Sequence, residues 1–79
     1  FAGMIANGRV FRGDKGRYVT FLTLGVGNGQ SIDVTLKKAF AYSDHDVVWG
    51  QGTIKHSNNS DYIECYDYQG HRLEKFRPA

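Results

Sequence analysis

The chain has 79 residues, of which 41% are hydrophobic, 14% aromatic and 23% charged. This composition is typical of one folded domain, and the length excludes a doubly wound sheet or an eight-stranded α/β barrel. The single cysteine, Cys65, excludes an intrachain disulfide, and the histidines show no zinc-like spacing to it. We therefore expect a small core that is stabilised by β-closure, self-association or a bound partner, without a metal or cofactor.

The net charge of +2 is distributed unevenly along the chain. Residues 1–40 hold six basic and two acidic side chains, a net charge of +4, whereas residues 41–79 hold four basic and six acidic ones, a net charge of −2. A basic half beside an acidic half favours one face suited to a polyanion, and ordinary surface charge is the alternative explanation.

The sequence indicates one domain with short ends. Phe1-Ala2-Gly3, before Met4, is typical of a processing or cloning remnant, so we expect the domain at residues 4–76 and a tail at residues 77–79. No apolar run approaches the roughly 20 residues of a membrane span. No signal peptide is visible either, and these two observations favour a cytoplasmic protein without membrane contacts.

Hydrophobic alternation of period two predicts strands in the first half of the chain. Residues 4–11 are expected to form a strand that Gly8 interrupts with a bulge or bend. The next expected strand, residues 18–26, points Phe21 outward. Its inward positions are Leu22, Leu24 and Val26. Asn28-Gly29 predicts a tight hairpin turn into a third strand at residues 31–37, where Ile32, Val34 and Leu36 point inward.

The second half predicts two more strands. Residues 38–46 form either a loop or one helical turn, and residues 47–54 form a fourth strand with Val48 and Ile54 inward and Trp49 outward. A fifth strand is expected at residues 62–68. Five short strands with glycines at bends can close into a partly open Greek-key barrel, which removes exposed sheet edges. An all-β, five-stranded barrel of the OB-fold type is therefore the expected fold, and an SH3-like barrel is the alternative.

Several segments resemble the single-stranded DNA-binding proteins of the OB-fold type. Asn7-Gly8-Arg9-Val10, residues 18–26 and Val48-Trp49-Gly50-Gln51-Gly52-Thr53-Ile54 are similar to the first, second and fourth strands of that family, and Tyr62-Ile63-Glu64-Cys65-Tyr66 falls at the fifth. The link between the third and fourth strands is too short for the family's usual helix, and the acidic partner-recruiting tail of its cellular members is missing. These departures indicate a minimal form, as in phage or plasmid replication proteins, in a bacterial or phage-infected cell.

Binding of single strands requires aromatic side chains on which bases stack and cations that follow the phosphates. Strand phase places Phe21 and Trp49 outside the core; the alternatives are a bulge that buries Phe21 and a core position for the single tryptophan. Phe11 either joins the site or packs as a minor core residue. Tyr62 and Tyr66 share one face of the fifth strand with Tyr68, and this tyrosine face either stacks bases or packs across a dimer interface. The candidate cations are Arg9, Arg12, Lys15, Arg17, Lys37, Lys38 and Lys55.

Catalysis finds little support in the sequence. His45 lies between Asp44 and Asp46, but no nucleophile pattern accompanies it, so we expect no enzyme. The predicted function is single-stranded DNA binding with little sequence preference, in replication or recombination, by a homodimer or larger homo-oligomer. A protein-interaction module of a replication complex is the first alternative, and a cold-shock-like RNA-binding protein is the second.

Overall fold

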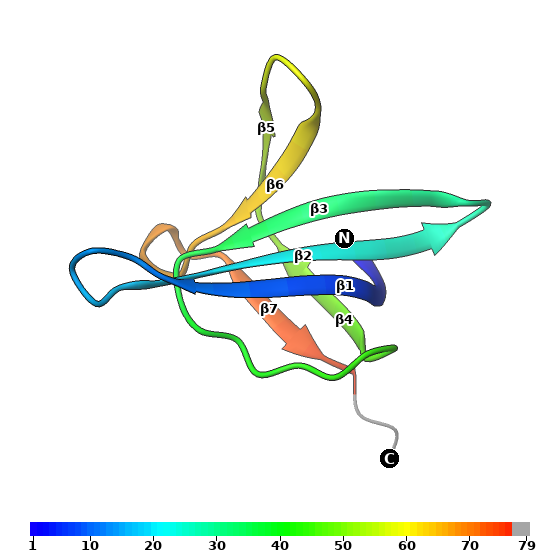
Figure 1. Cartoon of the computed structure of the whole chain (residues 1–79). Coiled ribbons are helices and arrows are strands. Elements are labelled where there is room, and N and C mark those ends of the chain that lie inside the picture. The colour runs from blue at the N-terminus through cyan, green and yellow to red at the C-terminus, as the bar shows by residue number, and fades with distance from the viewer. Residues whose placement is uncertain (77–79) are drawn as a thin grey trace.

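A computed structural model describes residues 1–76, which form a nearly all-β domain (Figure 1). The elements are β1 (Ala2–Arg12), β2 (Tyr18–Gly27), β3 (Gln30–Leu36), β4 (Val47–Gln51), β5 (Thr53–His56), β6 (Asp61–Cys65), the 3₁₀ turn η1 (Asp67–Gln69) and β7 (Arg72–Lys75). The predicted all-β barrel class is confirmed, but the predicted number of strands is wrong, because there are seven and not five. The expected tail at residues 77–79 lies outside the described residues. Within residues 1–76 no helix is long and apolar enough to cross a bilayer.

The strands form one curled sheet in the order β5-β6-β3-β2-β1-β4-β7. β1, β2 and β3 make an antiparallel meander, β3 pairs with β6 in parallel, and the start of β1 pairs with β4. Only Gly52 separates β4 from β5, although the two strands lie on opposite sides of the meander in this order. The sheet must therefore curl back on itself, and it forms a partly open barrel (Figure 1).

One extra strand arises because the predicted fourth strand is divided into β4 and β5, and the other is β7, which lies beyond the predicted fifth strand. At Gly52 the chain passes so close to β6 that any Cβ would clash with the carbonyl oxygen of Glu64. Beyond this point the β5–β6 hairpin stands away from the meander (Figure 1). Ile54, which was expected to point inward, is 64% exposed there. The predicted fifth strand ends at Cys65, and η1 replaces its last part.

The core consists of aliphatic side chains from nearly every strand. Its buried members are Ile5, Leu22, Leu24, Val34, Leu36, Val48, Cys65 and Leu73, with Ile32 partly buried against them. Val26 was also predicted to be inward but is exposed, because the β2–β3 register shifts between Gly25 and Gly27 and turns it out of phase. The predicted turn is present, and Asn28 has a φ of 56°.

The first strand differs from the prediction in its start and in its bulge. Ala2 and Gly3, which the sequence places outside the domain, pair with β4, and the Phe1 amino group donates to the Gly50 carbonyl at 2.9 Å. The register shift lies between Ile5 and Asn7 and not at Gly8. Gly8 stays paired with β2, and its missing Cβ leaves room for the ring of Tyr42.

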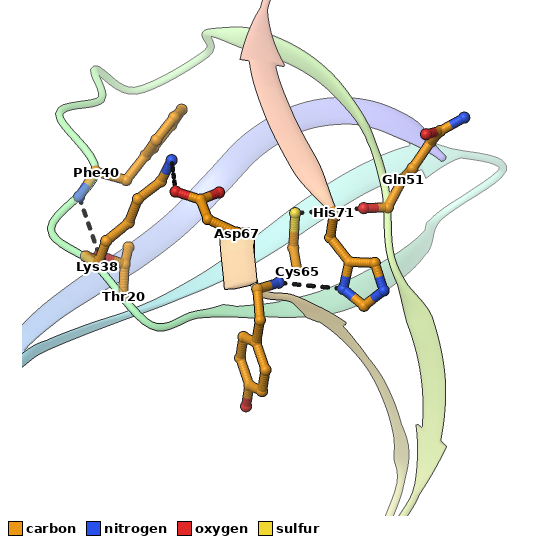
Figure 2. A network of polar contacts seen from close by, with 8 residues as sticks. Thr20, Lys38, Phe40, Gln51, Cys65, Asp67 and His71 are labelled. Carbon is orange, nitrogen blue, oxygen red and sulfur yellow. Dashed lines mark hydrogen bonds and ion pairs between the residues drawn. The ribbon is translucent and has the colours of Figure 1, made fainter. Parts of the chain in front are cut away.

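No helix forms between β3 and β4. Phe40 and Tyr42 instead pack against the core from this extended link, so they cover it where the resembled family has a helix. The buried Thr20 hydroxyl fixes the link, because it donates to the Lys38 carbonyl at 2.6 Å and accepts from the Phe40 amide at 3.1 Å (Figure 2). The Lys38 carbonyl and the Phe40 amide thereby both have a hydrogen-bond partner at the point where the link covers the core.

Candidate nucleic-acid interface

A groove of about 420 Å³ lies on the outer face of the sheet, where β2 and β3 meet β6. Strand alternation builds it, since the side chains between the core positions of β2 and β3 must point to this face. The side chains that define its walls and floor are Phe21, Thr23, Asp33, Thr35, Tyr62 and Tyr66. In OB-folds, the face of the second and third strands binds oligonucleotides.

Phe21 forms one aromatic wall of the groove. Its side chain is 45% exposed, as its strand phase predicts. Phe11, on the neighbouring strand, meets it edge-on, with ring centroids 5.6 Å apart and planes at 72°. The edge contact restrains the Phe21 ring without covering both of its faces, so the ring can stack against a planar ligand.

The opposite wall is made of tyrosines. Tyr62 is half-buried, whereas Tyr66 is only 7% exposed. The Tyr66 ring stacks on Tyr68 at a centroid distance of 5.5 Å, and the Lys37 ammonium lies 5.4 Å from its centroid. Tyr66 is thus part of a packed wall, and Tyr68, which is 73% exposed, presents the free ring. The sequence predicts Tyr68 on the same strand face as Tyr62 and Tyr66, but in the structure η1 carries its ring.

Burial perturbs two ionisable groups beside the groove. Burial, followed by the negative charge of Glu64, raises the pKa of Tyr66 to about 12. The phenol therefore stays protonated at physiological pH. Burial also raises the pKa of the Cys65 thiol, with Asp67 adding to the effect. Cys65 is buried, and its protonated thiol is a poor nucleophile.

Four cations lie at or near the tip of the β1–β2 hairpin. Arg9 pairs directly with Phe21 across the ladder, while Arg12, Lys15 and Arg17 surround the turn. The turn is closed by the Gly13 amide, which donates to the Arg17 carbonyl at 2.7 Å. All four side chains are exposed, and none forms an ion pair with another residue of the described range 1–76.

A second hollow of about 610 Å³ lies between this tip and the tyrosine wall. Arg17, Tyr18, Lys37, Lys38 and Tyr68 line it. It therefore continues the basic surface of the tip to the exposed ring of Tyr68. A ligand with alternating anionic and planar groups finds both kinds of contact along this path.

The other predicted cations differ in how freely their charge is available. Lys38 forms an ion pair with Asp67 at 2.9 Å (Figure 2), so much of its charge is compensated within the protein. Lys37 keeps its ammonium over Tyr66. Lys55 lies on the exposed β5 strand opposite Tyr62, beyond the groove itself.

Trp49 lies apart from these residues. It is on β4, which β1 separates from β2, and it is half-buried beneath the Arg72 guanidinium, whose carbon lies 5.0 Å from the ring centroid. It does not line the groove. The Trp49 side chain points out of the core, as predicted. The outer face of β4, however, lies on a different side of the barrel from the groove.

His71 is a further residue of this region that sequence reasoning did not single out. Its Nδ1 accepts from the Tyr66 amide at 3.2 Å (Figure 2). Its Nε2 lies 3.1 Å from Thr53 Oγ1. Since Nδ1 accepts, the neutral ring carries its proton on Nε2 and donates to the threonine. His71 thereby holds the tyrosine wall against β5, a role that no local sequence pattern indicates.

The structure brings most of the predicted site residues to one side of the molecule. Phe21, Tyr62 and Tyr66 line one groove, with Arg9, Phe11 and Lys37 against them and the tip cations beyond. Elsewhere, His45 occupies an exposed loop, and residues 1–76 contain no group of three His, Cys, Asp or Glu side chains placed to hold a metal ion. Comparisons with protein-family models, with curated proteins and with solved structures found no match to this chain.

Proposed function

We propose that this protein binds single-stranded DNA along the groove between β2, β3 and β6. The observation that carries the proposal is the aromatic groove that continues into unpaired cations, with Phe21 and Tyr62 on facing walls and Arg12, Lys15 and Arg17 beyond. Stacking needs unpaired bases, which a duplex does not offer, so the groove favours single strands. Every base has a π-face, and stacking therefore discriminates little among sequences.

The cellular role that fits this chemistry is to coat or protect exposed strands during replication or recombination, as the family resemblance implies. Self-association belongs to the same proposal, because a domain this small gains stability from surface buried between subunits. Stacking and phosphate contacts are possible with RNA as well as with DNA. The proposal selects DNA from these two related polymers.

A protein-interaction module is the second candidate function. The observation that favours it is β5, which forms one end of the sheet with all four residues exposed. Such an edge can pair with an extended segment of another protein through backbone hydrogen bonds.

Titration of fluorescently labelled oligo(dT) and oligo(rU) of equal length, followed by anisotropy, distinguishes these functions. The label must be on the oligonucleotide, because Trp49 lies away from the groove and is a poor intrinsic probe. We expect saturable binding of oligo(dT) and little binding of a blunt duplex, and the affinity for oligo(rU) relative to oligo(dT) measures any preference for DNA. An interaction module binds none of them, and a cold-shock-like protein binds both single strands.

A further inference from the structure

Asp33 places an acidic group inside the groove. Its Oδ1 accepts from the Thr23 hydroxyl at 3.1 Å, and within residues 1–76 its other carboxylate oxygen receives no hydrogen bond. The parallel pairing of Val34 with Ile63 sets Asp33 beside Tyr62, and both residues line the groove. An unused acceptor therefore lies between the aromatic walls.

Acidic side chains on the groove floor decide which side of a bound DNA strand faces the sheet. Asp33, on β3, lines the groove, and Glu64, on β6, is paired with Thr35 two residues further along β3. Both carboxylates repel phosphates, whereas Arg9 lies on β1, two strands away from Asp33, and Lys37 follows the end of β3. The phosphates must then follow the cations, and the edges of the bases point towards the carboxylates.

A carboxylate accepts hydrogen bonds and donates none when it is ionised. The amino groups of cytosine, adenine and guanine can donate to it, as the cytosine amino group does to acidic side chains in DNA complexes. Thymine has no amino group, and its one N–H is flanked by two carbonyl oxygens that a carboxylate repels. Asp33 lines the same groove as Phe21 and Tyr62, so its carboxylate borders the space where a base would stack.

We propose that the groove prefers bases that carry an exocyclic amino group over thymine, with Asp33 accepting the hydrogen bond. This inference rests on the proposed function and adds a base preference to it. Cytosine and thymine have rings of the same size, so oligo(dC) and oligo(dT) of equal length carry the same charge and offer closely similar stacking. Their difference in affinity therefore isolates the hydrogen bond.

The test is competition of unlabelled oligo(dC) and oligo(dT) against one labelled strand, at mildly alkaline pH where cytosine is unprotonated. We expect oligo(dC) to bind at least about tenfold more tightly, as one hydrogen bond to a charged group provides. In Asp33→Asn the preference should fall to within about twofold, because the neutral amide both donates and accepts. Asp44→Asn, which removes the same charge from an exposed loop, should keep the preference.

The outcomes are distinct. Equal binding of oligo(dC) and oligo(dT) by the wild-type protein overturns the base preference and leaves the proposed function intact. A preference that persists in Asp33→Asn, with circular dichroism showing an unchanged fold, also overturns the role of Asp33. Failure to bind either strand at low salt counts against the proposed function itself.

Discussion

Phe21 and Leu22 are adjacent on β2, yet they face different environments. Leu22 is 1% exposed in the core, whereas Phe21 is 45% exposed in the groove. Adjacent side chains of a strand point to opposite faces, and this rule allowed the outward position of Phe21 to be predicted. The pair therefore offers a matched test of site against core within one strand.

Replacing Phe21 by alanine should weaken oligonucleotide binding by about 1–3 kcal/mol, the value of stacking on one base. The unfolding free energy should fall less than in Leu22→Ala, which removes a core side chain and costs about 2–5 kcal/mol. Anisotropy titrations and urea unfolding measure the two effects. Trp49→Ala should weaken binding less than Phe21→Ala does, because the indole lies outside the groove. Unchanged binding in Phe21→Ala would contradict the assigned face.

Tyr66 should make the protein sensitive to alkaline pH. Because burial raises the pKa of Tyr66 to about 12, the folded state favours the protonated phenol. That contribution is complete below about pH 10, the ordinary pKa of tyrosine, and is lost as the pH rises towards the folded-state value. A pKa difference of this size corresponds to about 2–3 kcal/mol of unfolding free energy.

Urea unfolding at a series of alkaline pH values measures this dependence. The unfolding free energy of Tyr66→Phe should decline less steeply above about pH 10, because the variant has no phenol to ionise at this site. Tyr18→Phe removes a phenol from an exposed position and is the control. Parallel curves for the wild type and Tyr66→Phe would contradict the assignment.

The prediction of which side chains point inward failed where the pairing register between β2 and β3 shifts. The alternation that correctly set Leu22 and Leu24 inward also set Val26 inward, but the shift between Gly25 and Gly27 turned it outward. A bulge depends on how the neighbouring strand pairs, and that information is not in the strand's own sequence. Tyr68 was predicted on the tyrosine face, but as part of a continuous strand, whereas η1 presents its ring beside Tyr66.

At the scale of elements, the β1–β2 hairpin carries the strongest electrostatic feature of the molecule. Its composition could be predicted directly, because Arg12, Lys15 and Arg17 are close in sequence and a short turn keeps them together. The division of the fourth strand at Gly52 could not be predicted in this way. It is required by closure, since the chain must leave β1 and join β6 on the other side of the sheet.

Arg12→Ala combined with Arg17→Ala should weaken binding to all sequences alike. With about three to five phosphate contacts per protomer, the logarithm of the affinity should fall with the logarithm of the salt concentration at about 0.7 per contact. The double variant should lower this slope by about 1.4. Titrations at several salt concentrations measure it, and Arg72→Ala with Lys75→Ala, on β7, is the control of equal charge. A wild-type affinity independent of salt would contradict the role of the cations.

At the scale of the whole molecule, the partly open barrel leaves strands β5 and β7 at the two ends of the sheet. The expected dimer surface on the tyrosine face is smaller than the sequence indicates, because Tyr66 is buried within its own chain and only Tyr68 is widely exposed. The edge of β5, with Ile54 exposed, offers an alternative contact between copies.

Sedimentation equilibrium at tens of micromolar protein should show a homodimer or larger assembly. Ile54→Lys places a charge on the β5 edge and should shift the equilibrium towards monomer if that edge is the contact. Tyr68→Ala tests the tyrosine face in the same way. A wild-type species of only 8.9 kDa at this concentration would contradict self-association.

The parallel pairing of β3 with β6 also has a kinetic consequence. The meander needs only neighbouring hairpins, whereas joining Val34 to Ile63 and Ala2 to Trp49 closes long loops at an entropic cost. The wall with Phe21 can thus form early in folding, while the wall with Tyr62 reaches it only when the barrel closes. A DNA strand that binds between both walls binds only the closed barrel. Its binding should therefore slow unfolding, and the melting temperature should rise with oligonucleotide concentration.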